Sequence, residues 1–285
     1  MNNIRIGFIG LGNMGKPMAE QLLQAEYPLT VFNRDQEKQS PLVKLGAKAA
    51  ENPAEAAAES DFIIIMVSDD RAIKAIFEGE NGLSHINLKD KIIINMSTVS
   101  PGISKEIAAL CQAQGGEYLD APVSGSVKQA ETGQLVIMVG GKHAAFEKTK
   151  PILNVMGKLA NLVGDTGAGN NAKLAINSLL ALYAQGLAET VLFAQEKGIE
   201  PAALLELIGN AAIGNTFTKI KGDAILADNY KAAFALKHIV KDLKLAQAEG
   251  ISTPLVSAAL KTFESAEKQY GEEDIIAILK ALDIK

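Results

Sequence analysis

The 285-residue sequence has little of what several classes of protein require. Its one cysteine, Cys111, excludes an internal disulfide and is typical of a reducing compartment. Cys111 lies in an apolar helical pattern, which favours an inert buried thiol over a nucleophile. One cysteine and three scattered histidines do not have the spacing of metal ligands, so no metal is expected.

Long apolar runs and concentrated positive charge are also scarce. Asn, Ser, Gln or charged residues interrupt every candidate stretch, so we expect neither a bilayer-spanning segment nor a membrane partner. The N-terminus lacks a basic region followed by a long apolar segment, so no signal peptide is expected and we predict a cytoplasmic protein. A net charge of −5 without a basic tail or stripe argues against a nucleic-acid partner.

What the sequence does have is a glycine triplet at its beginning. Residues 4–9 form a short apolar run that leads directly into Gly10, Gly12 and Gly15, and a helical pattern follows. This spacing seats a dinucleotide pyrophosphate on a helix N-terminus: the first glycine permits the turn, the second admits phosphate, and the third allows close packing. A plain strand-to-helix turn is the competing interpretation, and the adjacent strand and helix favour the dinucleotide site.

Strand and helix patterns alternate through the first half of the chain. Continuous apolar runs predict strands at 62–67 and 92–94, and further strands are predicted at 29–32, 117–121, 135–139 and 159–163. Helical patterns lie between them, most clearly at 101–114 and 143–156. This alternation predicts a mainly parallel sheet with helices on both sides.

The pattern changes near residues 164–169, beyond which no strand is evident. One long helix is predicted over 170–197, with Gly198 ending it. So few charged residues interrupt this helix that most of its surface must be covered, and dimerisation through it is a hypothesis. We therefore predict a nucleotide-binding domain at 1–164 and an all-α domain at 165–285.

The residues after the second strand bear on the choice of cofactor. An acidic residue there accepts hydrogen bonds from the ribose of NAD, but this chain has Asn33 and Arg34. Arg34 can pair with the 2′-phosphate of NADP, and Lys38 adds positive charge one turn further. We assign Asp35 to capping the next helix. A solvated surface arginine is the alternative for Arg34, and its position favours NADP.

Three polar segments follow predicted strands and so face the cofactor. Residues 66–69 are expected on the adenosine side, and residues 97–101 near the nicotinamide ribose. Thr98 is the better candidate for a ribose contact, because Ser100 is as well suited to capping a helix that begins near Pro101. In the third segment, 120–126, Ser124 and backbone amides of a glycine-containing loop can hold a carboxylate.

The long helix supplies Lys173 and Asn177, whose spacing places both on one face. A lysine and an asparagine near the start of an apolar helix need polar partners, although a lysine can also reach solvent at a helix end. Lys241 and Asp242 could approach the same cleft from the second domain. An ordinary ion pair is the more economical interpretation of that dipeptide.

Together these motifs resemble the β-hydroxyacid dehydrogenase family over essentially the whole chain. The family includes 3-hydroxyisobutyrate dehydrogenases, tartronate semialdehyde reductases and glyoxylate/succinic semialdehyde reductases. The resemblance rests on the motifs at 10–15, 97–101, 120–125, 167–173 with Asn177, and 241–243. It implies an α/β Rossmann-like doubly wound sheet domain, a long interdomain helix and an all-α domain, assembled as a homo-dimer or homo-tetramer.

The resemblance also implies roles for the candidate residues. Lys173 is the expected catalytic residue, with Asn177 beside it, and Ser124, Gly125, Ser126, Lys241 and Asp242 are expected at the substrate. The predicted cofactor contacts are Gly10, Leu11, Gly12, Asn13, Met14, Gly15, Asn33, Arg34, Lys38, Met66, Val67, Ser68, Thr98 and Lys241.

Two departures from the family pattern narrow the prediction. Residues 125–128 read Gly-Ser-Val-Lys where many members have Gly-Gly, and this form looks like the glyoxylate/succinic semialdehyde reductases, which are typically NADPH enzymes. Ile176 stands where many members have a first asparagine before Asn177, which bears on the shape of the substrate pocket.

The expected reaction is hydride transfer from NADPH to a small carboxylic acid that bears an aldehyde, with Lys173 as proton donor. A 3-hydroxyisobutyrate-type dehydrogenase working oxidatively is the nearest alternative. An imine reductase shares the fold but commonly has Asp or Tyr at the position of Lys173. A catalytically silent oligomerisation module is the alternative from a different class, and the lysine argues against it.

Overall fold

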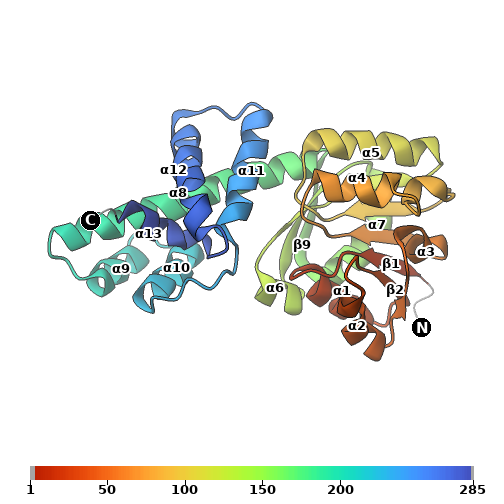
Figure 1. Cartoon of the computed structure of the whole chain (residues 1–285), viewed down its shortest axis with the longest axis horizontal. Helices are drawn as coiled ribbons and strands as arrows, with labels where there is room; N and C mark the ends of the chain where they lie inside the picture. The colour runs from red at the N-terminus through yellow and green to blue at the C-terminus, as the bar shows by residue number, and fades with distance from the viewer. Residues whose placement is uncertain (1–3, 284–285) are drawn as a thin grey trace. The chain divides into compact units, whose positions relative to one another are not determined.

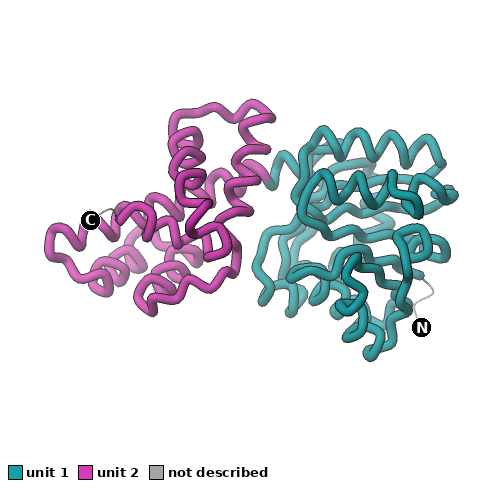
Figure 2. The backbone as a smooth tube through the Cα atoms, in the orientation of Figure 1, with its two compact units in different colours: residues 1–173 teal, residues 174–285 magenta. Residues whose placement is uncertain are grey.

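The computed structural model describes residues 4–283 and divides into two compact units, Met1–Lys173 (unit 1) and Leu174–Lys285 (unit 2) (Figure 2). The strands are β1 (Ile6–Ile9), β2 (Leu29–Phe32), β3 (Lys48–Ala49), β4 (Phe62–Ile65), β5 (Ile92–Asn95), β6 (Glu117–Asp120), β7 (Val123–Ser124), β8 (Leu135–Gly140) and β9 (Gly157–Gly164). The α-helices of unit 1 are α1 (Gly15–Gln24), α2 (Ser40–Lys44), α3 (Pro53–Ala58), α4 (Asp70–Glu78), α5 (Pro101–Ala113), α6 (Val127–Glu131) and α7 (His143–Met156). Helix α8 (Ala168–Glu196) begins in unit 1 and continues into unit 2.

The strands of unit 1 form one sheet in the order β3-β2-β1-β4-β5-β6-β8-β7, with β9 paired to β8. Pairing is parallel from β3 to β6, and Ile6 of β1 lies opposite Leu29 and Phe62 of its two neighbours. Strand β8 is antiparallel to both β6 and β7, and parallel to β9. The predicted parallel sheet is therefore confirmed, with an antiparallel part at one edge.

Helices cover both faces of this sheet (Figure 1). Phe8 and Ile64 point to the face where α1 and α7 pack, whereas Ile63 and Ile65 point to the face of α3, α4 and α5. Because β1, β4 and β5 are buried on both faces, they are continuously apolar up to Asn95 at the end of β5, and the sequence revealed them.

Strands β3 and β7 and the short helices α2 and α6 were not predicted from the sequence. Each of the two strands has only two residues, too few to show a period of two. The prediction for Asp35 is wrong: it precedes a 3₁₀ turn, η1 (Gln36–Gln39), and its side chain accepts no capping hydrogen bond there.

Within its described residues, unit 2 contains helices and one isolated bridge between Ala235 and Asp274. The helices are the rest of α8, α9 (Pro201–Asn210), α10 (Thr216–Leu226), α11 (Leu236–Ala248), α12 (Pro254–Tyr270) and α13 (Ile278–Leu282). Gly198, with φ +75°, follows α8 as predicted.

By length and composition, α8 could cross a membrane, although no bilayer-spanning segment was expected from the sequence. Core helices of folded proteins pass the same test, and α8 contributes Ala184, Ala188 and Val191 to the buried core of unit 2. Packing in the core of unit 2 therefore accounts for part of the apolar composition of α8.

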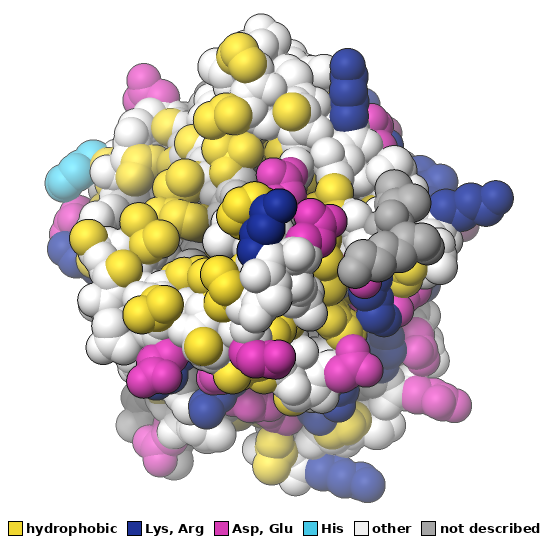
Figure 3. Space-filling model, turned by 90° about the vertical axis from the view of Figure 1, so that its left-hand side faces the viewer, with side chains coloured by type: hydrophobic (Ala, Val, Ile, Leu, Met, Phe, Trp, Pro, Cys, Tyr) yellow, Lys and Arg dark blue, Asp and Glu magenta, His cyan; other side chains and the backbone are white. Residues whose placement is uncertain are grey.

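Unit 2 also exposes many apolar side chains. Ten of the fourteen large hydrophobic residues that are exposed in the described chain belong to it, among them Leu179 and Phe193 of α8. Figure 3 shows hydrophobic side chains grouped on one face of the molecule. Large exposed apolar patches are typical of interaction surfaces.

Candidate active site

The turn after β1 has the geometry of a phosphate cradle. Gly10 has φ +99°, and a Cβ there would lie 2.2 Å from the carbonyl oxygen of Met66. A Cβ on Gly15 would lie 2.0 Å from the carbonyl oxygen of Gly10, whereas one on Gly12 would meet nothing within 4 Å. Gly10 and Gly15 are thus needed for the turn itself, and Gly12 leaves the approach to α1 open.

The N-terminus of α1 adds to this fit. Its N-cap residue, Met14, provides no side-chain capping hydrogen bond, and its first turn holds no acidic residue. The positive end of the helix dipole therefore faces an open approach without a competing carboxylate, which suits a pyrophosphate.

Asn33 braces the glycine turn from the end of β2. Its Oδ1 accepts a hydrogen bond from the backbone N–H of Leu11 at 2.8 Å, and its Nδ2 donates to the carbonyl of Asp35 at 2.9 Å. The Leu11 amide is thus already satisfied, and Asn33 shapes the cradle from within the protein.

Positive charge follows Asn33 directly. Arg34 is exposed, and its guanidinium forms no ion pair with any residue in the range 4–283. Lys38 lies 3.9 Å from a carboxylate oxygen of Asp35, so its charge is partly neutralised. Arg34 is therefore the better placed of the two for an external phosphate.

The loops after β4 and β5 are joined by hydrogen bonds. The Val67 amide donates to Oγ of Ser97 at 2.9 Å, and the Ser97 amide donates to Oδ1 of Asn95 at 3.1 Å. Met66, Val67 and Thr98 are half-buried and Ser68 is exposed, so the predicted cofactor contacts lie on one connected rim at the carboxyl ends of the strands. Parallel sheets bind ligands at this edge.

Ser100 has the capping role that the sequence left open. Its Oγ accepts from the Ile103 amide at 3.1 Å and donates to Oδ2 of Asp70 at 2.5 Å. Both functions of this hydroxyl are therefore taken, and the cofactor contact expected for Thr98 stays a prediction.

The loop from Ser124 to Ser126 separates β7 from α6. Gly125 has φ +146°, a conformation that few other residues adopt, and Ser124 is half-buried. The backbone amide of Ser126, at 2.8 Å, and its hydroxyl both donate hydrogen bonds to Oε1 of Gln129. Ser126 therefore shapes the start of α6, and Ser124 is the freer hydroxyl for a carboxylate.

Lys173 lies in the second turn of α8 and is 7% exposed. The helix before it is fixed by Asp120, the last residue of β6, whose two oxygens accept from the amides of Gly167 at 2.7 Å and Asn170 at 2.8 Å. Burial raises the pKa of the Asp120 carboxyl, and the hydrogen bonds from Gly167 and Asn170 act against that shift. Sequence reasoning did not assign a role to Asp120 or Asn170, although an aspartate that ends a buried strand was a usable signal.

In unit 2, Asn177 and Asp242 are paired and almost fully buried. Nδ2 of Asn177 donates to Oδ2 of Asp242 at 2.5 Å. Oδ1 of Asp242 accepts no hydrogen bond of good geometry from the described residues, but lies 3.0 Å from Nζ of Lys241. The ion pair expected for Lys241 and Asp242 is therefore present, and Asp242 also fixes the orientation of the Asn177 amide.

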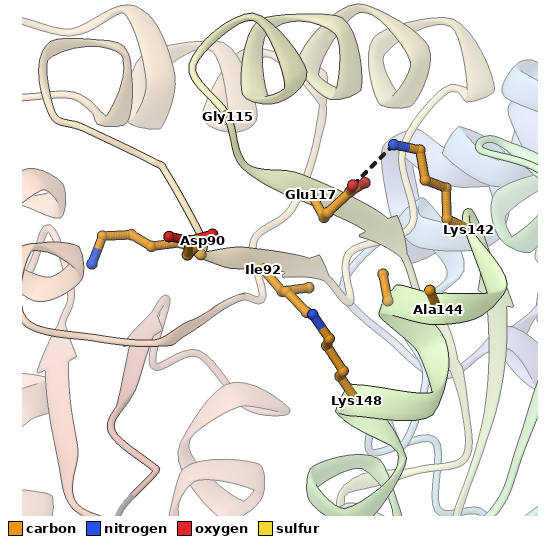
Figure 4. Close-up of a pocket in the computed structure, with 9 residues that line it drawn as sticks. Asp90, Ile92, Gly115, Glu117, Lys142, Ala144 and Lys148 are labelled. Carbon is orange, nitrogen blue, oxygen red and sulfur yellow. Dashed lines mark hydrogen bonds and ion pairs between the residues drawn. The ribbon is translucent and has the colours of Figure 1, made fainter.

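A pocket of about 210 Å³ lies at the opposite, amino ends of the strands (Figure 4). Ile92 and Glu117 begin their strands beside it, and Lys142 pairs with Glu117 at 2.9 Å. Nζ of Lys91 donates to the carbonyls of Ala58 and Ser60. Lys142, Glu117 and Lys91 thus already have polar partners. Parallel sheets bind ligands at the carboxyl ends of their strands, so we do not assign the active site to this pocket. Among residues 4–283, no cluster of His, Cys, Asp or Glu could hold a metal.

Two family models cover nearly the whole chain. The NAD-binding domain of 6-phosphogluconate dehydrogenase matches residues 5–167, and the NAD-binding part of NADP-dependent 3-hydroxyisobutyrate dehydrogenase matches residues 167–282. These matches support a nicotinamide dinucleotide, and NADP in particular, as the cofactor.

Individual relatives point the same way. Glyoxylate/succinic semialdehyde reductase 2 of Arabidopsis thaliana is 36% identical over 99% of this chain and 80% of its own length. The 2-hydroxy-3-oxopropionate reductase of Escherichia coli is 34% identical over 99% and 98%. A Mycobacterium tuberculosis 3-hydroxyisobutyrate dehydrogenase solved with L-serine is 28% identical, covers 98% and 99%, and has a TM-score of 0.89.

Proposed function

We propose a specific reaction for this chain, which belongs to the β-hydroxyacid dehydrogenase family and is an NAD(P)-dependent oxidoreductase of hydroxyl and aldehyde groups. It uses NADPH to reduce a small carboxylic acid that bears an aldehyde, of the glyoxylate or succinic semialdehyde type. In this proposal Lys173 is the proton donor. The similarity to an Arabidopsis glyoxylate/succinic semialdehyde reductase over nearly the whole chain supports the substrate class.

The observation that carries the proposal is the burial of Lys173. A lysine that is 7% exposed gives up most of its hydration, which is unfavourable without polar partners. Its helix is anchored to the strand ends of the nucleotide-binding unit through Asp120. The burial of Lys173 and the anchoring of its helix support a role as an acid catalyst, which needs a well-positioned amine.

The bound nicotinamide supplies the hydride. Ser124 and the amides of its loop hold the substrate carboxylate, which orients the aldehyde. The ammonium of Lys173 donates a hydrogen bond to the aldehyde oxygen and then gives its proton as negative charge develops there. Asn177, whose amide is oriented by Asp242, positions the lysine or the substrate. Gly12 and the open N-terminus of α1 hold the pyrophosphate.

The proposal is tested with Lys173→Met and the exposed control Lys148→Met. Each is assayed with NADPH and with glyoxylate, succinic semialdehyde, tartronate semialdehyde and methylmalonate semialdehyde. We expect Lys173→Met to lower kcat by about 10²–10⁴-fold, because a positioned acid is worth that much, and to keep its affinity for NADPH. Lys148→Met is expected to behave as wild type. Retention of a tenth of the wild-type kcat by Lys173→Met would reject the acid.

Oxidation of a 3-hydroxy acid is the second candidate, because one family model describes NADP-dependent 3-hydroxyisobutyrate dehydrogenase. Its chemistry is the reverse, with Lys173 accepting the proton. Assaying 3-hydroxyisobutyrate with NADP⁺ and NAD⁺ beside the aldehyde panel separates the two. A higher kcat/KM for the hydroxy acid than for every aldehyde would favour this second candidate.

A further inference from the structure

Asn170 is fully buried, and each of its polar groups has a different partner. Its Oδ1 accepts from the Val99 amide at 3.0 Å, and its Nδ2 donates to Oγ of Ser104 at 3.2 Å. Its backbone N–H donates to Oδ2 of Asp120 at 2.8 Å. One residue therefore joins the loop after β5, helix α5 and the end of β6.

The place of Asn170 in α8 links these contacts to Lys173. Residues three apart lie on the same side of a helix, about 4.5 Å apart along its axis. The Asn170 contacts therefore fix both the rotation and the height of the turn that carries Lys173. A shift by one residue would turn the lysine by about 100°.

The start of α8 packs so closely against Asp120 that the two cannot move independently. A Cβ on Gly169 would lie 2.6 Å from the carbonyl oxygen of Asp120, and one on Gly140 would lie 2.7 Å from the Gly169 amide. Strand β8, β6 and the first turn of α8 are thus in backbone contact. The Asp120 bonds hold the helix backbone, whereas the Asn170 side chain connects this turn to the loop that contains Thr98.

We propose that Asn170 is a positioning residue that holds the Thr98 loop and the Lys173 turn in one frame. The proposal rests on the proposed role of Lys173 as the acid. An amide is suited to this task because it offers a donor and an acceptor at once, and both are used here. Asn170 touches neither cofactor nor substrate in this scheme and acts through Val99 and its own helix.

The test compares Asn170→Ala with Asn171→Ala. Both changes favour the helix and remove the same side chain, but Asn171 is exposed. Backbone amide exchange in residues 96–104 is measured without ligand, NADPH affinity by fluorescence, and kcat and KM with the best aldehyde of the panel. Asn170→Ser, which keeps a hydroxyl, replaces Asn170→Ala if that variant does not fold.

For Asn170→Ala we expect exchange at Val99 to be faster by about tenfold or more, because its hydrogen bond is lost. We expect kcat to fall by about 10²-fold, as for a misplacement of about 1 Å, with KM and NADPH affinity within about threefold of wild type. Asn171→Ala is expected to match wild type in every measurement.

Two results would overturn the proposal. Unchanged exchange in residues 96–104 would do so whatever happens to turnover, because the loop would then not depend on Asn170. An unchanged kcat in Asn170→Ala, together with an inactive Lys173→Met, would also overturn the Asn170 proposal. The proposed role of Lys173 as the acid would then still stand. An active Lys173→Met would instead refute the proposed function, and the exchange measurement would still decide whether Asn170 holds the loop.

Discussion

Single residues determine what this protein can bind, and Arg34 is the clearest case. It follows the brace residue Asn33, is exposed, and has no ion-pair partner within residues 4–283. Lys38 is near Asp35 and carries less available charge. We therefore expect the preference for NADPH over NADH to depend mainly on Arg34.

We predict that Arg34→Ala raises the KM for NADPH by about tenfold or more and leaves the KM for NADH unchanged. A hydrogen bond to a charged group is worth about 1.5–3 kcal/mol, and exposure places this one at the lower end. Lys38→Ala should have a smaller effect, and Lys44→Ala, on the exposed side of α2, none. Equal rises for both cofactors would show that Arg34 does not read the 2′-phosphate.

Other residue-level predictions met different outcomes. Cys111 is buried, which confirms the predicted burial, and burial raises the pKa of its thiol to about 12, which disfavours the reactive thiolate. Asn52 caps α3, with its side chain accepting from the Glu55 amide. Asp35 precedes a 3₁₀ turn, and its side chain accepts no capping hydrogen bond there. Local rules fail where the backbone conformation depends on more than the next few residues.

At the scale of elements, one buried carboxylate organises part of unit 2. Asp274, at the start of η3 (Ile275–Ala277), pairs with Lys221 of α10 at 2.7 Å, and both side chains are under a tenth exposed. The same carboxylate accepts from the amides of Ala233, Phe234 and Ile276. It thereby holds α10, η3 and the segment before α11 together.

We predict that Lys221→Met destabilises unit 2 by about 3–5 kcal/mol, because it leaves the Asp274 charge buried without its partner. Urea unfolding followed by circular dichroism measures the change. The exposed pair of Lys237 and Glu272, 2.6 Å apart, provides the control: Glu272→Gln should cost less than about 1 kcal/mol. Similar losses in both variants would contradict an effect of burial.

At the scale of the whole molecule, one face of α8 points to a partner. Ile176, Leu179, Tyr183 and Phe193 are each more than two-fifths exposed, and their spacing places them on one stripe. Gly186 lies on the same stripe, and a Cβ there would meet nothing within 4 Å. The stripe is therefore apolar and locally flat, which suits close packing against a second copy of this chain.

We predict that the wild-type chain is a homo-oligomer and that the double variant Leu179→Glu, Phe193→Glu is a monomer by light scattering at micromolar concentration. Two buried carboxylates would oppose association strongly. Leu255→Glu, at an equally exposed leucine of α12, should keep the wild-type mass. A wild-type monomer would refute the interface outright, and an oligomeric double variant would place it elsewhere.

The sequence by itself determined the order of the longer strands and helices of unit 1, the glycine turn and the helical character of unit 2. These follow from local physics: buried parallel strands must be continuously apolar, and a tight turn to a helix needs glycine. The tertiary structure alone decided which polar side chains meet. Asp120 and the Gly167 amide are 47 residues apart in sequence, and Asn177 and Asp242 are 65 apart, yet each pair forms a buried hydrogen bond. No periodicity encodes such pairs, because they exist only once the sheet and the helices have packed.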